Sequence, residues 1–183
     1  MNDHLDAWQV RLDAQWQRLD SMPPEAFVAA IDGLAAERPA GDAAALFERG
    51  AARDSTGLES GAEGLYRAAL ATGRLDPYRN ARAVIQLAST LRILGHLEES
   101  EKILTTELDR RAQAGGEHVL HDELRAILAL TWVAQGRAVE AAGLALCALA
   151  PHLTRYNRSM LGNATEILEN AQRSDAGTAT RIP

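Results

Sequence analysis

Aromatic side chains are scarce in this sequence, since Phe, Trp and Tyr together make up only 4% of the 183 residues. A core must therefore be built mainly from alanine and leucine, which are abundant. Both residues enter helices at little cost in side-chain entropy. Almost no segment shows the alternating β-branched pattern of a strand. The composition thus predicts an all-α protein whose helices pack closely.

Other absences restrict the classes of function. The single cysteine, Cys147, excludes an intramolecular disulfide and suits a reducing compartment. The net charge of −6 argues against a general nucleic-acid binder, because neutralising phosphates requires a basic surface. The first residues lack the apolar stretch of a secretory signal, and the longest apolar run, 141–151, is too short to span a bilayer. We therefore expect a cytoplasmic protein that binds neither nucleic acid nor membrane.

Motifs of catalysis are also missing. The chain contains no G-x-S-x-G, no phosphate-binding loop and no H-E-x-x-H. His118 and His121 form an i, i+3 pair beside Asp122, but no second ligand motif accompanies them, as a metal site would require. We expect no catalytic residue, no metal and no cofactor. A ligand-sensing or enzymatic helical domain that uses the His118/His121 corner is the alternative.

Three glycines recur between pairs of predicted helices, at Gly57, Gly95 and Gly136, with spacings of 38 (95 − 57) and 41 (136 − 95) residues. A period of this size predicts stacked helical hairpins. Small residues lie seven positions before and five positions after each glycine: Gly50 and Ala62, Ala88 and Ser100, Ala129 and Ala141. We expect these small residues to let the two helices of each hairpin touch.

This arrangement resembles the tetratricopeptide repeat, and Ala62, Tyr66 and Ala69 carry the resemblance best. Arg49 and Arg53 depart from it, because they stand where the family usually has apolar residues. The period is also longer than the family's usual value of about 34 residues. The stretch 54–108 further resembles a small group of compact bacterial proteins of this family with unassigned function. The resemblance implies a right-handed superhelix of stacked antiparallel hairpins with about nine helices.

The predicted organisation places the repeats in the middle of the chain. Its segments are an N-terminal helix pair that could be a degenerate repeat (1–41), three repeats (42–76, 77–117 and 118–152), a C-terminal capping helix (153–173) and a flexible tail (174–183). The capping helix would cover the apolar end of the array and present a polar face to solvent.

The first predicted helix, 3–19, carries an apolar stripe. Its members step by three and four residues, as one face of a helix requires: Leu5, Trp8, Leu12, Trp16 and Leu19. The stripe either packs on the next helix or forms the seam of a homodimer. The first interpretation is favoured, because most amphipathic stripes serve their own core.

The resemblance implies that the first helix of each hairpin lines a concave face. By pattern position, this face includes Phe47 and Ala51 in the first repeat and Leu130 and Val133 in the third. The second repeat supplies a row of polar residues on one helix face: Arg82, Gln86, Ser89 and Arg92. Asp54 of the first repeat adjoins this row.

Two guanidiniums beside an amide and a hydroxyl could clamp a carboxylate or an extended peptide backbone. Alternatively, the row is only a solvated helix face with Arg92 paired to Asp54. The family's best-known peptide clamp uses Lys and Asn, which are absent from these positions, so binding of chaperone tails is not expected. The sequence predicts a non-catalytic adaptor or scaffold that binds a protein or peptide through Asp54, Arg82, Gln86, Ser89 and Arg92.

Overall fold

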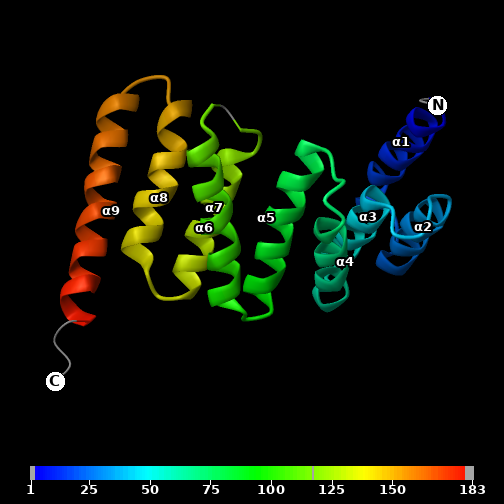
Figure 1. Ribbon diagram of the computed structural model, residues 1–183, viewed down its shortest axis with the longest axis horizontal. Helices are drawn as coiled ribbons and strands as arrows, with labels where there is room; N and C mark the ends of the chain where they lie inside the picture. Colours follow the sequence, from blue (N-terminus) through cyan, green and yellow to red (C-terminus); the bar gives the residue numbers. More distant parts are fainter. Residues whose placement is uncertain (1–2, 117, 180–183) are drawn as a thin grey trace. The chain divides into compact units, whose positions relative to one another are not determined.

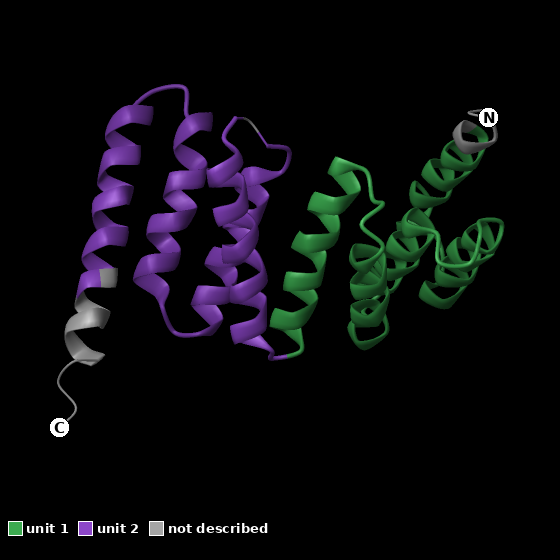
Figure 2. Ribbon diagram, viewed as in Figure 1, with its two compact units in different colours: residues 1–94 green, residues 95–183 purple. Residues whose placement is uncertain are grey.

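The computed structural model describes residues 3–116 and 118–179, and all regular structure in these ranges is helical (Figure 1). The described part contains nine α-helices and two short 3₁₀ helices, Leu19–Ser21 and Ala150–His152. The all-α prediction is confirmed. The chain forms two compact units, Met1–Leu94 and Gly95–Pro183, and the boundary falls inside the predicted second repeat (Figure 2).

Unit 1 contains five α-helices whose ends follow local signals. They are α1 (Asp3–Trp16), α2 (Pro24–Ala36), α3 (Ala43–Asp54), α4 (Glu59–Ala71) and α5 (Pro77–Ile93). The Asp42 carboxylate accepts a hydrogen bond from the Ala45 amide at 2.9 Å, and Asp76 does the same for Arg79 at 2.9 Å. These are N-caps of α3 and α5. Gly57, between α3 and α4, has φ = 77°, which a residue with a side chain rarely adopts.

The tryptophan stripe of α1 packs inside unit 1. Trp8 and Leu12 are buried in one cluster with Phe27 and Ile31 of α2. The Trp16 ring lies edge-to-face on Phe27, with ring centroids 5.1 Å apart. The Trp8 indole also donates to the backbone carbonyl of Leu34 at 2.9 Å. Trp8, Leu12 and Trp16 of the stripe therefore pack against α2, as the favoured interpretation expects.

The hairpin of α3 and α4 depends on the absence of a side chain at Gly50. A Cβ added to Gly50 would lie 3.0 Å from two ring carbons of Tyr66. Tyr66 is fully buried, and its ring packs on Phe47 with centroids 6.0 Å apart. Ala62 is fully buried in the same hairpin. The predicted close approach at Gly50 is confirmed.

The two arginines that depart from the repeat pattern have a common partner. Arg49 Nε donates to one oxygen of Asp32 at 2.9 Å, and Arg53 Nη2 donates to the other at 2.8 Å. Asp32 belongs to α2, so this cluster joins α2 to α3. Hydrogen bonds from Arg53, and secondarily from Arg49, lower the pKa of the Asp32 carboxyl against the opposing effect of burial. Ion pairing thus replaces the apolar contact that is usual at these positions.

Unit 2 contains α6 (Leu97–Ala114), α7 (His121–Ala134), α8 (Ala138–Leu149) and α9 (Asn157–Ala179), and consecutive helices pack on one another (Figure 1). A Cβ on Gly143 of α8 would lie 2.8 Å from Leu168 Cγ of α9. The last helix continues to Ala179, beyond the start of the predicted tail, and residues 180–183 lie outside the described part. No helix in the described ranges is both long and apolar enough to cross a membrane.

A polar cluster joins three helices of unit 2. The Trp132 indole donates to Glu101 at 2.7 Å, and Arg137 pairs with the same carboxylate at 2.6 Å. The Arg137 guanidinium also lies 4.6 Å from the centre of the Trp132 ring and bonds Glu140 of α8 at 2.7 Å. Arg137 in the α7–α8 turn thus holds α6, α7 and α8 together through charge and ring contact.

Candidate functional site

The five predicted partner-binding residues all belong to unit 1. Arg82, Gln86, Ser89 and Arg92 lie on α5, and Asp54 is the last residue of α3. The Thr90 hydroxyl of α5 donates to Asp54 Oδ1 at 3.2 Å, and this bond brings Asp54 to α5. The alternative pairing of Asp54 with Arg92 is not what the structure shows, because Asp54 forms no ion pair with any described residue.

Asp54 is a half-buried acceptor that ties three helices together. Its second oxygen accepts from the Tyr66 hydroxyl of α4 at 3.2 Å. Burial raises the pKa of the Asp54 carboxyl, and the hydrogen bonds from Thr90 and Tyr66 offset this only in part. Burial and the neighbouring Asp54 charge raise the pKa of the Tyr66 phenol far above its usual range, so the hydroxyl stays a donor. The observed role of Asp54 is to join α3, α4 and α5.

Arg82 is held between two aromatic rings. Its guanidinium carbon lies 4.9 Å from the centre of the Phe47 ring and 5.8 Å from the centre of the Tyr78 ring. Such contacts stabilise a cation without neutralising its charge. Arg82 and Arg92 form no ion pair within the part of the chain that the structure describes. Arg82 is therefore a positioned positive charge that can still bind an acceptor.

The prediction that Phe47 and Ala51 line a groove is wrong. Both residues are fully buried, and the Arg82 guanidinium covers the Phe47 ring. The physical reason is that α5 packs on α3 at these positions. In unit 2, by contrast, Leu130 and Val133 of α7 are 48% and 55% exposed, which agrees with their predicted place on a free face.

Two polar atoms of the α5 row lack partners. Gln86 Oε1 and Arg92 Nε are buried and form no hydrogen bond. A buried polar atom without a partner costs about 1–3 kcal/mol. Both side chains are only partly buried as a whole, as is Ser89, so they remain close to the surface of α5.

The contacts of two residues next to the row, Tyr78 and Thr90, were not predicted from the sequence. Tyr78 lies four residues before Arg82, so the helical spacing did contain the signal for this contact. Thr90 and Asp54 are separated by 36 positions, and no local pattern indicates their hydrogen bond.

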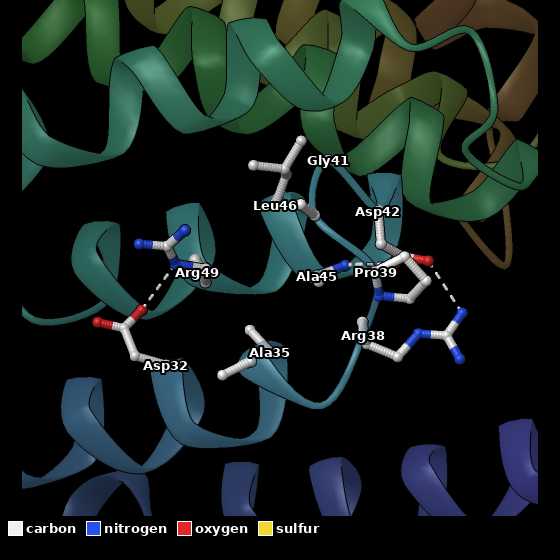
Figure 3. Close-up of a pocket in the computed structure, with 11 residues that line it drawn as sticks. Asp32, Ala35, Arg38, Pro39, Gly41, Asp42, Ala45, Leu46 and Arg49 are labelled. Atoms are coloured by element: carbon white, nitrogen blue, oxygen red, sulfur yellow. Dashed lines mark hydrogen bonds and ion pairs between the residues drawn. The ribbon is translucent and has the colours of Figure 1, made fainter.

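A pocket of about 500 Å³ lies between α2 and α3 in unit 1 (Figure 3). Figure 3 shows an ion pair at each end, Asp32 with Arg49 and Arg38 with Asp42. Between them the lining is mostly apolar and includes Leu46. Each carboxylate of the lining is already held by an arginine. The Asp32–Arg49 pair joins α2 to α3, and the Arg38–Asp42 pair lies within the connection between these two helices.

The histidine corner lies in unit 2. His118 Nε2 is 3.1 Å from the Arg111 carbonyl oxygen, and both His118 and His121 line a pocket of about 750 Å³. His121 Nδ1 is buried without a hydrogen-bond partner. Among the described residues, no three His, Cys, Asp or Glu side chains converge as a metal would require.

Comparison with known proteins addresses the repeats directly. A family model described as Tetratrico peptide repeat matches residues 43–167, which is more than half of the chain. The match begins at the first residue of α3 and reaches into α9. Comparison with curated proteins and with solved structures gave no match. The matched residues, the paired helices and the close approach at Gly50 agree, and the chain belongs to the tetratricopeptide repeat family.

Proposed function

We propose that this chain is a non-catalytic adaptor or scaffold of the cytoplasm, and that the partly exposed row of α5 binds an extended peptide segment of a partner protein. Membership of the tetratricopeptide repeat family indicates a protein–protein interaction module. The observation that carries the finer proposal is the row itself: Arg82 is held in place by two rings, while Gln86 and Arg92 keep buried polar atoms without partners.

The row has the donors and acceptors that a peptide backbone needs. Arg82 and Arg92 donate to carbonyl or carboxylate oxygens, and hydrogen bonds to a charged group contribute about 1.5–3 kcal/mol each. Gln86 can both accept from a peptide N–H and donate to a peptide C=O. The Ser89 hydroxyl adds a further donor and acceptor one turn along the helix.

Asp54 has a supporting role in this proposal. It fixes α5 against α3 through Thr90 and holds the Tyr66 hydroxyl, so the row keeps its place when a partner binds. Arg82 gains rigidity from the Phe47 and Tyr78 rings, which lowers the entropy lost on binding.

The test is a comparison of two double variants of the full chain. Partners captured from lysate by the unmodified chain are identified, and the dissociation constant of each is measured with purified protein. Arg82→Ala with Arg92→Ala is expected to weaken binding at least tenfold, because about 1.5 kcal/mol is lost for each charged hydrogen bond.

The matched control is Arg74→Ala with Arg158→Ala, which removes the same charge from two exposed side chains that form no ion pair in the described part. Circular dichroism should show that both variants remain helical. The proposal is wrong if the two double variants bind every captured partner with the same affinity.

A further inference from the structure

The polar row of α5 has an exposed apolar residue at each end. Tyr78 is 53% exposed and lies four residues before Arg82, and Ile93 is 52% exposed and directly follows Arg92. With 3.6 residues in each helical turn, Tyr78 and Ile93 leave the helix axis within about 40° of the direction of Arg82. One side of α5 therefore carries a polar row with apolar surface at both ends.

The carboxylates beside the row are already bound within the protein. Arg79, one turn before the row, pairs with Glu48 at 3.1 Å and with Asp76 at 3.0 Å. Glu48 is also only 2% exposed. Asp54 accepts its hydrogen bonds from two hydroxyl groups. Despite the net charge of −6, none of these three carboxylates pairs with an arginine of the row.

Arg82 and Arg92 are therefore partly exposed cations without a carboxylate. Neither forms an ion pair with any residue in 3–116 or 118–179. Arg82 is held in place by the Phe47 and Tyr78 rings, which stabilise the cation and leave its charge intact. Arg92 Nε is buried, so this side chain lies against the protein surface. The charge and planar shape of a carboxylate match the parallel N–H donors of a guanidinium.

The distance between the two arginines sets the distance between the groups that they bind. Arg82 and Arg92 are ten positions apart (92 − 82 = 10), which along an α-helix is about 15 Å. An extended peptide advances about 3.3 Å per residue, and alternate side chains point to the same side. Residues four positions apart therefore share a side at about 13 Å, the even separation closest to 15 Å. Tyr78 lies about 6 Å before Arg82, which corresponds to two extended residues.

We propose that the α5 row binds an acidic extended segment in which two Asp or Glu residues are four positions apart and apolar residues lie two positions outside them. One carboxylate pairs with Arg82 and the other with Arg92. The flanking apolar side chains pack toward Tyr78 and Ile93. This inference rests on the proposed binding of a peptide by the row and adds the chemistry of the partner.

The experiment measures the affinity of the full chain for three end-blocked, fluorescently labelled peptides by anisotropy. The acidic probe is Gly-Leu-Ser-Glu-Ser-Ser-Ser-Glu-Ser-Leu-Gly, whose side chains follow the same order in both chain directions. The second peptide has Gln in place of each Glu. The third, Gly-Leu-Ser-Ser-Glu-Ser-Glu-Ser-Ser-Leu-Gly, keeps the composition and charge but places the carboxylates two positions apart.

We expect saturable binding of the acidic probe. The Gln peptide should bind at least about tenfold more weakly, because both charge-assisted hydrogen bonds are lost. The third peptide should bind about tenfold more weakly than the probe, because its two carboxylates cannot reach both arginines. Higher salt should reduce the difference between the acidic probe and the Gln peptide, since salt screens partly exposed charges.

Two variants connect the spacing effect to α5. Arg92→Gln removes one of the two cations, so the two acidic peptides should then bind with equal affinity. The matched control is Arg74→Gln, which removes an exposed charge from the same unit and should leave the difference between these peptides unchanged. An equal spacing effect in Arg92→Gln and Arg74→Gln overturns the assignment to Arg92.

The peptides also separate this inference from the proposed function. Equal affinity of the unmodified chain for all three peptides, or no saturable binding of the acidic probe, overturns the acidic pattern. Captured partners that still lose affinity in the Arg82→Ala, Arg92→Ala double variant would then retain the row as a peptide site of different chemistry. Captured partners that bind this double variant as before overturn the proposed function as well.

Discussion

Gly50→Ala is the substitution whose effect follows most directly from the coordinates. The new Cβ would lie 3.0 Å from two carbons of the Tyr66 ring and 3.4 Å from Leu65 Cβ. Tyr66 cannot retreat easily, because its ring is fully buried against Phe47 and its hydroxyl is bonded to Asp54. One added methyl group must therefore displace a tethered ring or separate α3 from α4.

The magnitude comes from two opposing effects. Overpacking a core costs about 1–3 kcal/mol. Replacing glycine by alanine inside a helix contributes about 1 kcal/mol in favour of folding. We expect Gly50→Ala to lower the free energy of unfolding by up to about 2 kcal/mol, because a buried and tethered neighbour makes the overpacking the larger effect.

Gly64→Ala supplies the matched control. Gly64 lies in α4, and nothing lies within 4 Å of the Cβ that it would gain. This variant should be more stable than the unmodified chain by about 0.5–1 kcal/mol. Both variants change glycine to alanine in a helix, so effects on the unfolded chain and on helix propensity cancel in their difference. That difference, about 1–3 kcal/mol, measures the overpacking alone.

Urea unfolding followed by far-ultraviolet circular dichroism measures both free energies. The dependence of the unfolding free energy on urea should be the same in the two variants, because they expose the same surface on unfolding. Equal stability of Gly50→Ala and Gly64→Ala would refute the argument, since it would mean that α3 and α4 have room for a methyl group at Gly50.

Three further predictions concern other contacts. Gly143→Ala, whose Cβ would lie 2.8 Å from Leu168 Cγ, should lower the free energy of unfolding by up to about 2 kcal/mol once the helix gain is subtracted. Gly162→Ala, with open space around it, should not lower it, and urea unfolding compares the two variants. Burial raises the pKa of the Asp54 carboxyl in the folded state, so protonation of Asp54 should stabilise the unmodified chain as the pH falls through that pKa. Asp54→Asn should lack this gain, and unfolding experiments over a pH series measure it. Asp32→Ala leaves Arg49 and Arg53 without their carboxylate. It should lower the free energy of unfolding by about 1 kcal/mol, a small value because the ion pairs are partly exposed, and the loss should be smaller in high salt.

The fold was largely predictable because its signals are local. Asp42 and Asp76 precede the helices that they cap, and both caps are present. Gly57 and Gly136 take the positive φ that a turn between paired helices requires. The small residue at Gly50 predicts a close helix pair, and α4 does approach α3 there. The end of α9 was missed, since no proline or glycine cap marks Ala179.

The candidate surface was predictable only in part. The row on α5 follows from the helical period, because Arg82, Gln86 and Arg92 share a face whatever surrounds the helix. Their environment did not follow, since the Phe47 ring beneath Arg82 comes from another helix. The prediction that Phe47 lines the groove failed for the same reason.

The sequence alone determined that the chain is helical, where most of its helices begin, and that it is built from paired helices of the tetratricopeptide type. These properties depend on caps, turn glycines and periodic side chains, which act over a few residues. Only the tertiary structure decided that Asp54 binds Thr90 and Tyr66, that Asp32 holds Arg49 and Arg53, and that Gly143 faces Leu168. Such contacts depend on how whole helices pack in space, and a one-dimensional pattern carries no record of which side chain stands opposite another.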